Sequence, residues 1–149
     1  MLSVLTAGPT RDIVQTALQQ LTHEWWERRS RSFDLFISDF VLREASRGDK
    51  VAARRRLDAA ANLKELSVNV AIETLATRLL NETRMPSKAQ QDAAHLACAA
   101  VHGMDYLVTW NCTHIANAVL IPQVQAVCLL AGHKCPQICT PQELMVNPA

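Results

Sequence analysis

The sequence carries almost no net charge of either sign. Its 15 lysines and arginines are balanced by 14 aspartates and glutamates, which leaves a formal net charge of +1 at pH 7. Proteins that bind nucleic acid usually present a strongly basic surface, so a balance this even gives no strong signal for such a partner. The overall charge therefore does not indicate what the protein binds.

Long apolar runs are also missing. The longest apolar tract, residues 118–131, is interrupted by Pro122, Gln123 and Gln125, so we do not expect it to span a bilayer. The first seven residues, MLSVLTA, lack the basic start and the length of a signal peptide. We find no internal repeat and no low-complexity segment. The sequence therefore predicts a cytoplasmic protein with no membrane association.

Cysteine is present in an odd number, which argues against a complete set of disulfides. The five cysteines cluster towards the end of the chain, at positions 98, 112, 128, 135 and 139. Without an export signal, free thiols in a reducing compartment are the simplest interpretation. A metal site formed by His133, Cys135 and Cys139 is a weaker alternative, because these spacings match no common zinc pattern.

The chain contains enough apolar residues for a substantial core. Hydrophobic residues make up 49% of its 149 residues, so we expect one globular domain over residues 1–149. Charge is unevenly distributed, with 11 basic and 8 acidic residues in 1–64 but 4 and 6 in 65–149. Two arginine clusters, residues 28–31 and 54–56, allow a basic face on the first half, although solvated helix faces are the better explanation from charge alone.

Apolar spacing and capping residues predict an alternation of helices and strands. Thr10, Ser38, Asp49, Asn69 and Ser87 are the expected helix starts. The expected helices are 10–30, 38–48, 49–63, 69–82, 87–103 and 116–133, the last kinked or split by Pro122, with a short one after Pro141. The expected strands are 33–37, 65–68, 105–110 and 137–140. Strands separated by helices indicate an α/β fold with a mainly parallel sheet covered on both faces.

Polar residues follow the ends of these strands, where ligands bind in open parallel sheets. Glu44 lies on the helix after the first strand, and Asn111 lies at the end of 105–110. Asp92 lies on an otherwise small and apolar helix, where a lone acid needs water, a partner or a cation. Each has an ordinary interpretation: a surface acid for Glu44, a paired core acid for Asp92 and a turn residue for Asn111. His114 is expected to pack or to cap a helix.

Three segments, VLREAS (41–46), QQDAAHLACA (90–99) and LVTWNCTHIANA (107–118), resemble the later motifs of PIN-domain nucleases. The likeness is greatest to bacterial toxins of the VapC type and covers essentially the whole chain. It implies a three-layer α/β/α fold and an acidic cluster that binds Mg²⁺ or Mn²⁺ and cleaves RNA. Carried over by position, Glu44 and Asp92 are catalytic metal ligands, and Asn111 falls where many relatives have a fourth acid. An antitoxin protein is an implied partner.

PIN domains begin with a strand that ends in an acid, and MLSVLTAGPTRD resembles the segment after that strand. The first metal-binding acid would thus lie just upstream of Met1, which predicts weak or absent nuclease activity. We expect residues 1–7 to be extended, or a homo-oligomer to cover the surface that this strand would bury. The alternative function is a non-catalytic module that binds nucleic acid or a partner protein. A thiol or zinc enzyme using Cys112 and His114 is a weaker third interpretation.

Overall fold

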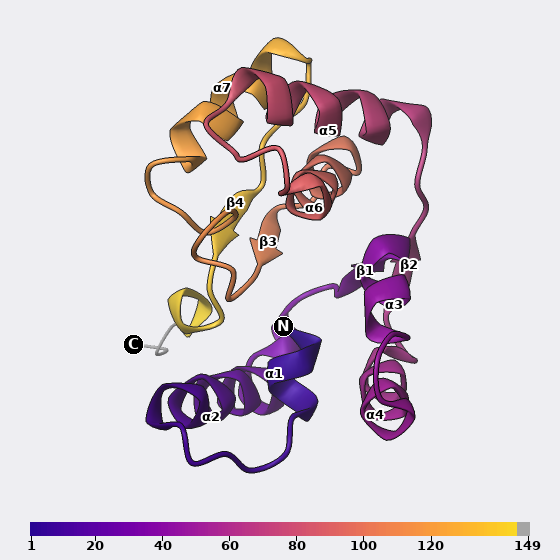
Figure 1. Ribbon diagram of the computed structural model, residues 1–149, viewed down its shortest axis with the longest axis vertical. Coiled ribbons are helices and arrows are strands. Elements are labelled where there is room, and N and C mark those ends of the chain that lie inside the picture. The colour runs from indigo at the N-terminus through magenta and orange to yellow at the C-terminus, as the bar shows by residue number, and fades with distance from the viewer. Residues whose placement is uncertain (146–149) are drawn as a thin grey trace. The chain divides into compact units, whose positions relative to one another are not determined.

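The structure, a computed structural model, describes residues 1–145. Contacts along the chain divide it into two compact units (Figure 1). Unit 1 contains residues 1–65 together with the chain from residue 141 onward, and unit 2 contains residues 66–140. Each unit has buried side chains of its own, so the two are described separately.

Unit 1 is mainly helical. Its elements are the helices α1 (Leu2–Thr6), α2 (Ile13–Arg28), α3 (Asp39–Ala45) and α4 (Lys50–Ala60), the 3-10 turns η1 (Ser30–Ser32) and η2 (Gln142–Leu144), and the strand β1 (Phe36–Ser38). The strand β2 (Lys64–Leu66) pairs with β1 in a two-stranded parallel sheet and ends at the boundary with unit 2.

The start of the chain is a helix, so the prediction that residues 1–7 are extended is wrong. Leu2 and Leu5 are both buried, and they pack in one cluster with Ile37, Ala45 and Ala60. Residues three apart share one face of a helix but point to opposite faces of an extended strand. Burying both leucines in the same cluster therefore requires the helical conformation that α1 adopts.

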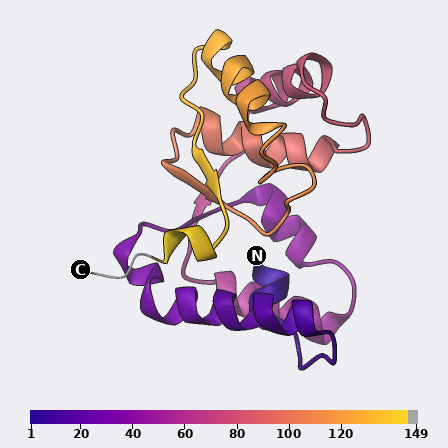
Figure 2. The same ribbon diagram turned by 90° about the vertical axis from the view of Figure 1, so that its left-hand side faces the viewer.

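An aromatic group stabilises the far end of α2. Trp25 is 2% exposed, and its ring centroid lies 6.3 Å from that of Trp26 and 6.0 Å from that of Phe33. These separations are typical of favourable aromatic pairs. The turn η2 lies beside α2, as Figure 2 shows, and buries Leu144. Trp25 therefore belongs to the core of unit 1.

Unit 2 consists of three packed helices and two strands. The helices are α5 (Val70–Glu82), α6 (Gln90–Val101) and α7 (Ile121–Leu130), and the strands are β3 (Tyr106–Val108) and β4 (Gln137–Cys139). Ile72, Leu75 and Leu79 recur at helical spacing on α5 and are each at most 2% exposed. They lie on the helix that contacts both α6 and α7. The buried residues of α6 are mostly alanine, which allows the two helices to approach closely.

The two strands of unit 2 run parallel, with α7 in the connection between them. Leu107 pairs with Ile138, and Val108 pairs with Cys139. One further bond beyond the register, from the Thr109 amide to the Cys139 carbonyl at 2.9 Å, attaches the chain that follows β3 to the end of β4. The register therefore fixes the point at which the loop after β3 begins.

Most predicted elements exist, but several boundaries differ. Ser38, Asp49 and Asn69 each cap their helix through a side-chain oxygen, as predicted. Asp12, not Thr10, caps α2, and Ala89, not Ser87, precedes α6 without any side-chain cap. Residues 116–120 are not helical: Pro122 lies in the first turn of α7 and neither kinks nor splits it. Proline tolerates this position because first-turn amides have no partner inside the helix.

The observed fold is mixed α/β with two separate two-stranded parallel sheets. Every strand is three residues long, shorter than predicted. The wider sheet and the three-layer arrangement stay predictions. Among the described residues, no helix combines the length and the apolar character needed to cross a membrane.

Candidate functional site

Asp92 lies in the first turn of α6, the third residue of that helix. An acid is favourable there because the amides of the first turn create a partial positive charge. Its side chain is 20% exposed, whereas the later part of α6, from Leu96 to Ala100, is buried. The carboxylate is therefore partly covered by protein but still open to solvent.

Asn111 lies in the loop after β3 and contacts Asp92 directly. Its side-chain nitrogen donates a 2.9 Å hydrogen bond to Oδ1 of Asp92. Its side-chain oxygen accepts a 3.0 Å bond from the backbone amide of His114, and its own backbone amide donates to the Thr109 hydroxyl at 3.0 Å. The backbone donor identifies the oxygen end of the amide, so the nitrogen must face Asp92.

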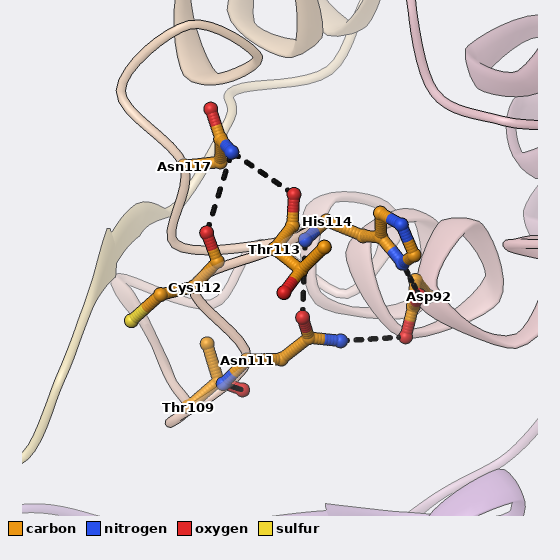
Figure 3. Close-up of polar contacts among 7 residues, drawn as sticks. All are labelled: Asp92, Thr109, Asn111, Cys112, Thr113, His114 and Asn117. Carbon is orange, nitrogen blue, oxygen red and sulfur yellow. Dashed lines mark hydrogen bonds and ion pairs between the residues drawn. The ribbon is translucent and has the colours of Figure 1, made fainter.

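His114 completes this cluster, as Figure 3 shows. Its Nδ1 lies 2.8 Å from Oδ2 of Asp92, and its side chain is 22% exposed. Both carboxylate oxygens of Asp92 thus have a side-chain partner, one from Asn111 and one from His114. The sequence prediction that His114 only packs or caps a helix missed this contact.

The hydrogen bond determines which ring nitrogen of His114 carries a proton. An ionised carboxylate only accepts hydrogen bonds, so Nδ1 must be the donor. In the neutral imidazole, Nε2 is then an acceptor. The cluster can therefore hold a proton on Nδ1 while Nε2 remains available as a base or as a ligand.

The loop that carries Asn111 and His114 is held by a second asparagine. The oxygen of Asn117 accepts bonds from the amides of Val119 and Leu120, and its nitrogen donates to the carbonyls of Cys112 and Thr113 (Figure 3). Asn117 thus supports the chain that leads into α7. Cys112 is exposed in the same loop.

Glu44 lies on α3, in unit 1, and its side chain is half-buried. It lies close enough to the α-amine of Met1 to interact electrostatically. Burial lowers the pKa of this amine, and the negative charge of Glu44 partly opposes the change. The structure does not place unit 1 relative to unit 2, so the grouping of Glu44 with Asp92 and Asn111 stays a prediction.

The two arginine clusters are partly engaged in their own helices. Arg28 pairs with Glu24 at 2.8 Å, and Arg54 pairs with Asp58 at 3.0 Å. Arg56 donates to two backbone carbonyls at the end of α3 and beyond it. Several members of the predicted basic face therefore stabilise local structure, which is the ordinary interpretation of such clusters.

Within residues 1–145, no three or more His, Cys, Asp or Glu side chains are grouped so that they could hold a metal ion. This includes the weak alternative formed by His133, Cys135 and Cys139. Asp92, Asn111 and His114 contribute one carboxylate, one amide and one imidazole to the cluster in unit 2.

Comparisons with protein-family models, with curated proteins and with solved structures found no match for this chain.

Proposed function

We propose that this chain is a metal-dependent ribonuclease of the PIN type, in which Asp92 is a ligand of Mg²⁺ or Mn²⁺. The observation that supports this most is how Asp92 is held. Its carboxylate is part-exposed and oriented by an amide and an imidazole, whereas an ordinary structural acid is more often paired with Lys or Arg. The resemblance of residues 41–46, 90–99 and 107–118 to PIN motifs adds Glu44 as a second ligand.

Asp92 suits a hard cation. Mg²⁺ prefers oxygen ligands and retains several waters. A carboxylate has about four acceptor positions, so the two hydrogen bonds leave lone pairs for a metal. Ligating carboxylates are usually hydrogen-bonded to the surrounding protein. When bound, such an ion would activate a water molecule and stabilise charge on the phosphate oxygens.

The residues around Asp92 would then orient its carboxylate towards the metal. Asn111 and His114 restrict the rotation of the carboxylate, so that its remaining lone pairs keep one direction. The oxygen of Asn111 is already bonded to the His114 amide, so we assign this residue to the orientation of Asp92. Its direct contact with a metal stays a prediction. Glu44 would supply the second negative charge that one carboxylate alone does not give.

Cleavage of unstructured RNA with millimolar Mn²⁺ tests this proposal. We expect slow cleavage that is lost on addition of EDTA and on replacement of Asp92 by Asn. Asp105→Asn is the matched control, because Asp105 lies in the same unit with its side chain 83% exposed. Cleavage that persists in Asp92→Asn, or that falls equally in both variants, would contradict the assignment of Asp92.

A non-catalytic module is the second candidate, and one observation favours it. Both oxygens of Asp92 already have protein partners, so the cluster is stable as a purely structural connection between α6 and the loop after β3. In that case RNA or an antitoxin-like protein would bind without metal. Binding of labelled RNA that is unchanged by chelator and by Asp92→Asn, without any cleavage, would support this function over the first.

The proposed assembly is a cytoplasmic homo-oligomer. Large apolar side chains at the surface support it, among them Leu129 and Leu130, which are 77% and 75% exposed. Light scattering after size-exclusion chromatography measures the mass directly. A monomer at micromolar concentration would refute the homo-oligomer and would leave the ribonuclease proposal in place.

A further inference from the structure

The turn between α3 and α4 is held to α4 by an arginine. Gly48 in this turn has a φ of +83°, a conformation that favours glycine. The guanidinium of Arg56, on α4, donates to the carbonyl of Ala45 at 3.1 Å and to that of Arg47 at 2.7 Å. The two helices also pack against each other (Figure 1). The backbone of the turn therefore has a fixed position against α4.

Three cations in this turn and on α4 have no acidic partner. Arg47, Lys50 and Arg55 are exposed, and none of them forms an ion pair with any residue in the described range 1–145. Residues 46–58 contain five basic and two acidic residues, which gives this short segment a net charge of +3 against +1 for the whole chain. The positive charge of the protein is therefore concentrated at this place.

The exposed side of α4 lacks the apolar side chains that a protein partner would bury. Val51 is the one large apolar side chain exposed on α4, all of which the structure describes, and Lys50, Arg54 and Arg55 are exposed on the same helix. Protein interfaces have a core with few charges, whereas phosphates are bound by exposed lysine and arginine. The helix has no aromatic side chain on which a base could stack. This side therefore fits the phosphates of a nucleic acid better than its bases or a protein.

We propose that Arg47, Lys50 and Arg55, the 47–55 surface, bind the phosphate backbone of single-stranded RNA without reading its sequence. The proposal rests on the proposed function, since RNA is the substrate proposed there. Each cation that neutralises a phosphate releases a counterion, so the affinity falls as the salt concentration rises. Phosphate contacts carry no sequence information. The 47–55 surface thus supplies affinity for an unstructured strand, and any sequence preference arises elsewhere.

Fluorescence anisotropy of labelled oligouridine tests this, with EDTA present to prevent metal-dependent cleavage. The triple variant Arg47→Gln, Lys50→Gln, Arg55→Gln should raise the Kd by about tenfold or more at low salt. The slope of log affinity against log salt should become shallower by about 0.7 for each contact removed. The double variant Arg47→Lys, Arg55→Lys keeps both charges and should bind like the parent. Because the assay contains EDTA, loss of this binding and loss of cleavage are separate results.

The matched control is the triple variant Arg11→Gln, Arg84→Gln, Lys134→Gln, which removes the same charge from exposed positions scattered along the chain. It should bind oligouridine like the parent. An equal loss in both triple variants would show that overall charge governs binding and would overturn the proposal. A Kd for oligocytidylate that differs more than about threefold from that for oligouridine would also overturn it, because backbone contacts do not distinguish bases. Tighter binding of polyglutamate than of RNA would instead mark a site for an acidic protein.

Discussion

The side-chain amide of Asn111 makes two hydrogen bonds, one as an acceptor through its oxygen and one as a donor through its nitrogen. The oxygen accepts from the His114 amide, and the nitrogen donates to Asp92. Asn111→Asp keeps the first contact but places a second carboxylate beside Asp92. Without metal we expect a loss of about 1–3 kcal/mol in the free energy of unfolding. Mn²⁺ should recover much of it, because two carboxylates bind a cation more tightly than one.

Thermal unfolding with EDTA and with Mn²⁺ measures both effects. Asn117→Asp is the control, because this substitution also removes amide bonds, but to the carbonyls of Cys112 and Thr113. Its loss of stability should be the same with and without metal. If Mn²⁺ changed the thermal stability of Asn111→Asp and Asn117→Asp by the same amount, Asp92 and its neighbour would not form a cation site.

A second residue-scale prediction concerns Arg78 and Glu82 on α5. Arg78 donates two hydrogen bonds to the Glu82 carboxylate, at 2.7 and 3.1 Å, and these lower the pKa of that carboxyl. The pair therefore stabilises the fold at neutral pH, and this stabilisation is lost as the pH falls through the lowered pKa of Glu82. In Arg78→Ala, an NMR titration should show the pKa of Glu82 rising towards its ordinary value. An unchanged titration would refute the pairing in solution.

Part of the candidate site could be predicted from the sequence. Asp92 stood out because it is a lone acid on an apolar helix, and Asn111 because it follows a strand. The contact between them, and the partner role of His114, could not be predicted, because they join residues 19 and 22 positions apart in the chain. Such contacts depend on how α6 packs against the loop, which no local pattern specifies.

At the scale of elements, α5 offers a direct test of the core of unit 2. Ile72 is 0% exposed and Val70, two residues earlier, is 76% exposed. Ile72→Ala should cost about 2–5 kcal/mol, because it removes buried methyl groups and leaves a cavity. Val70→Ala should change stability by less than about 0.5 kcal/mol. Chemical denaturation of both variants measures the difference, and similar losses would contradict the observed orientation of α5.

Helix starts were predictable where the cap is local. Ser38, Asp49 and Asn69 each accept from an amide three residues later, a contact that the sequence nearly dictates. Strand lengths were not predictable, because a strand extends only as far as its partner does. The conformation of residues 2–6 depended on a distant cluster with Ala45 and Ala60, so the helix there was missed.

At the scale of the whole molecule, the most deeply buried side chains are concentrated in unit 2. Among the described residues, the largest fully buried side chains are Ile72, Leu75, Leu79, Leu96, Cys98, Val124, Cys128 and Pro136 in unit 2, and Thr22 and Pro141 in unit 1. Opening free energies within one protein range from near zero to that of global unfolding, and they follow burial. Unit 2 should therefore be the more stable part of the chain.

Native-state hydrogen exchange measured by mass spectrometry tests this difference. Amides in the middle of α5 and α6 should exchange at least about tenfold more slowly than those in α1 and α4. The long helix α2 serves as an internal control, because it belongs to unit 1 but buries Trp25 within an aromatic group. If helix length alone determined protection, the amides of α2 would exchange as slowly as those of α5. If burial determines it, only the α2 amides near Trp25 will exchange that slowly. Uniform protection across both units would instead mean that the chain opens as a single cooperative body.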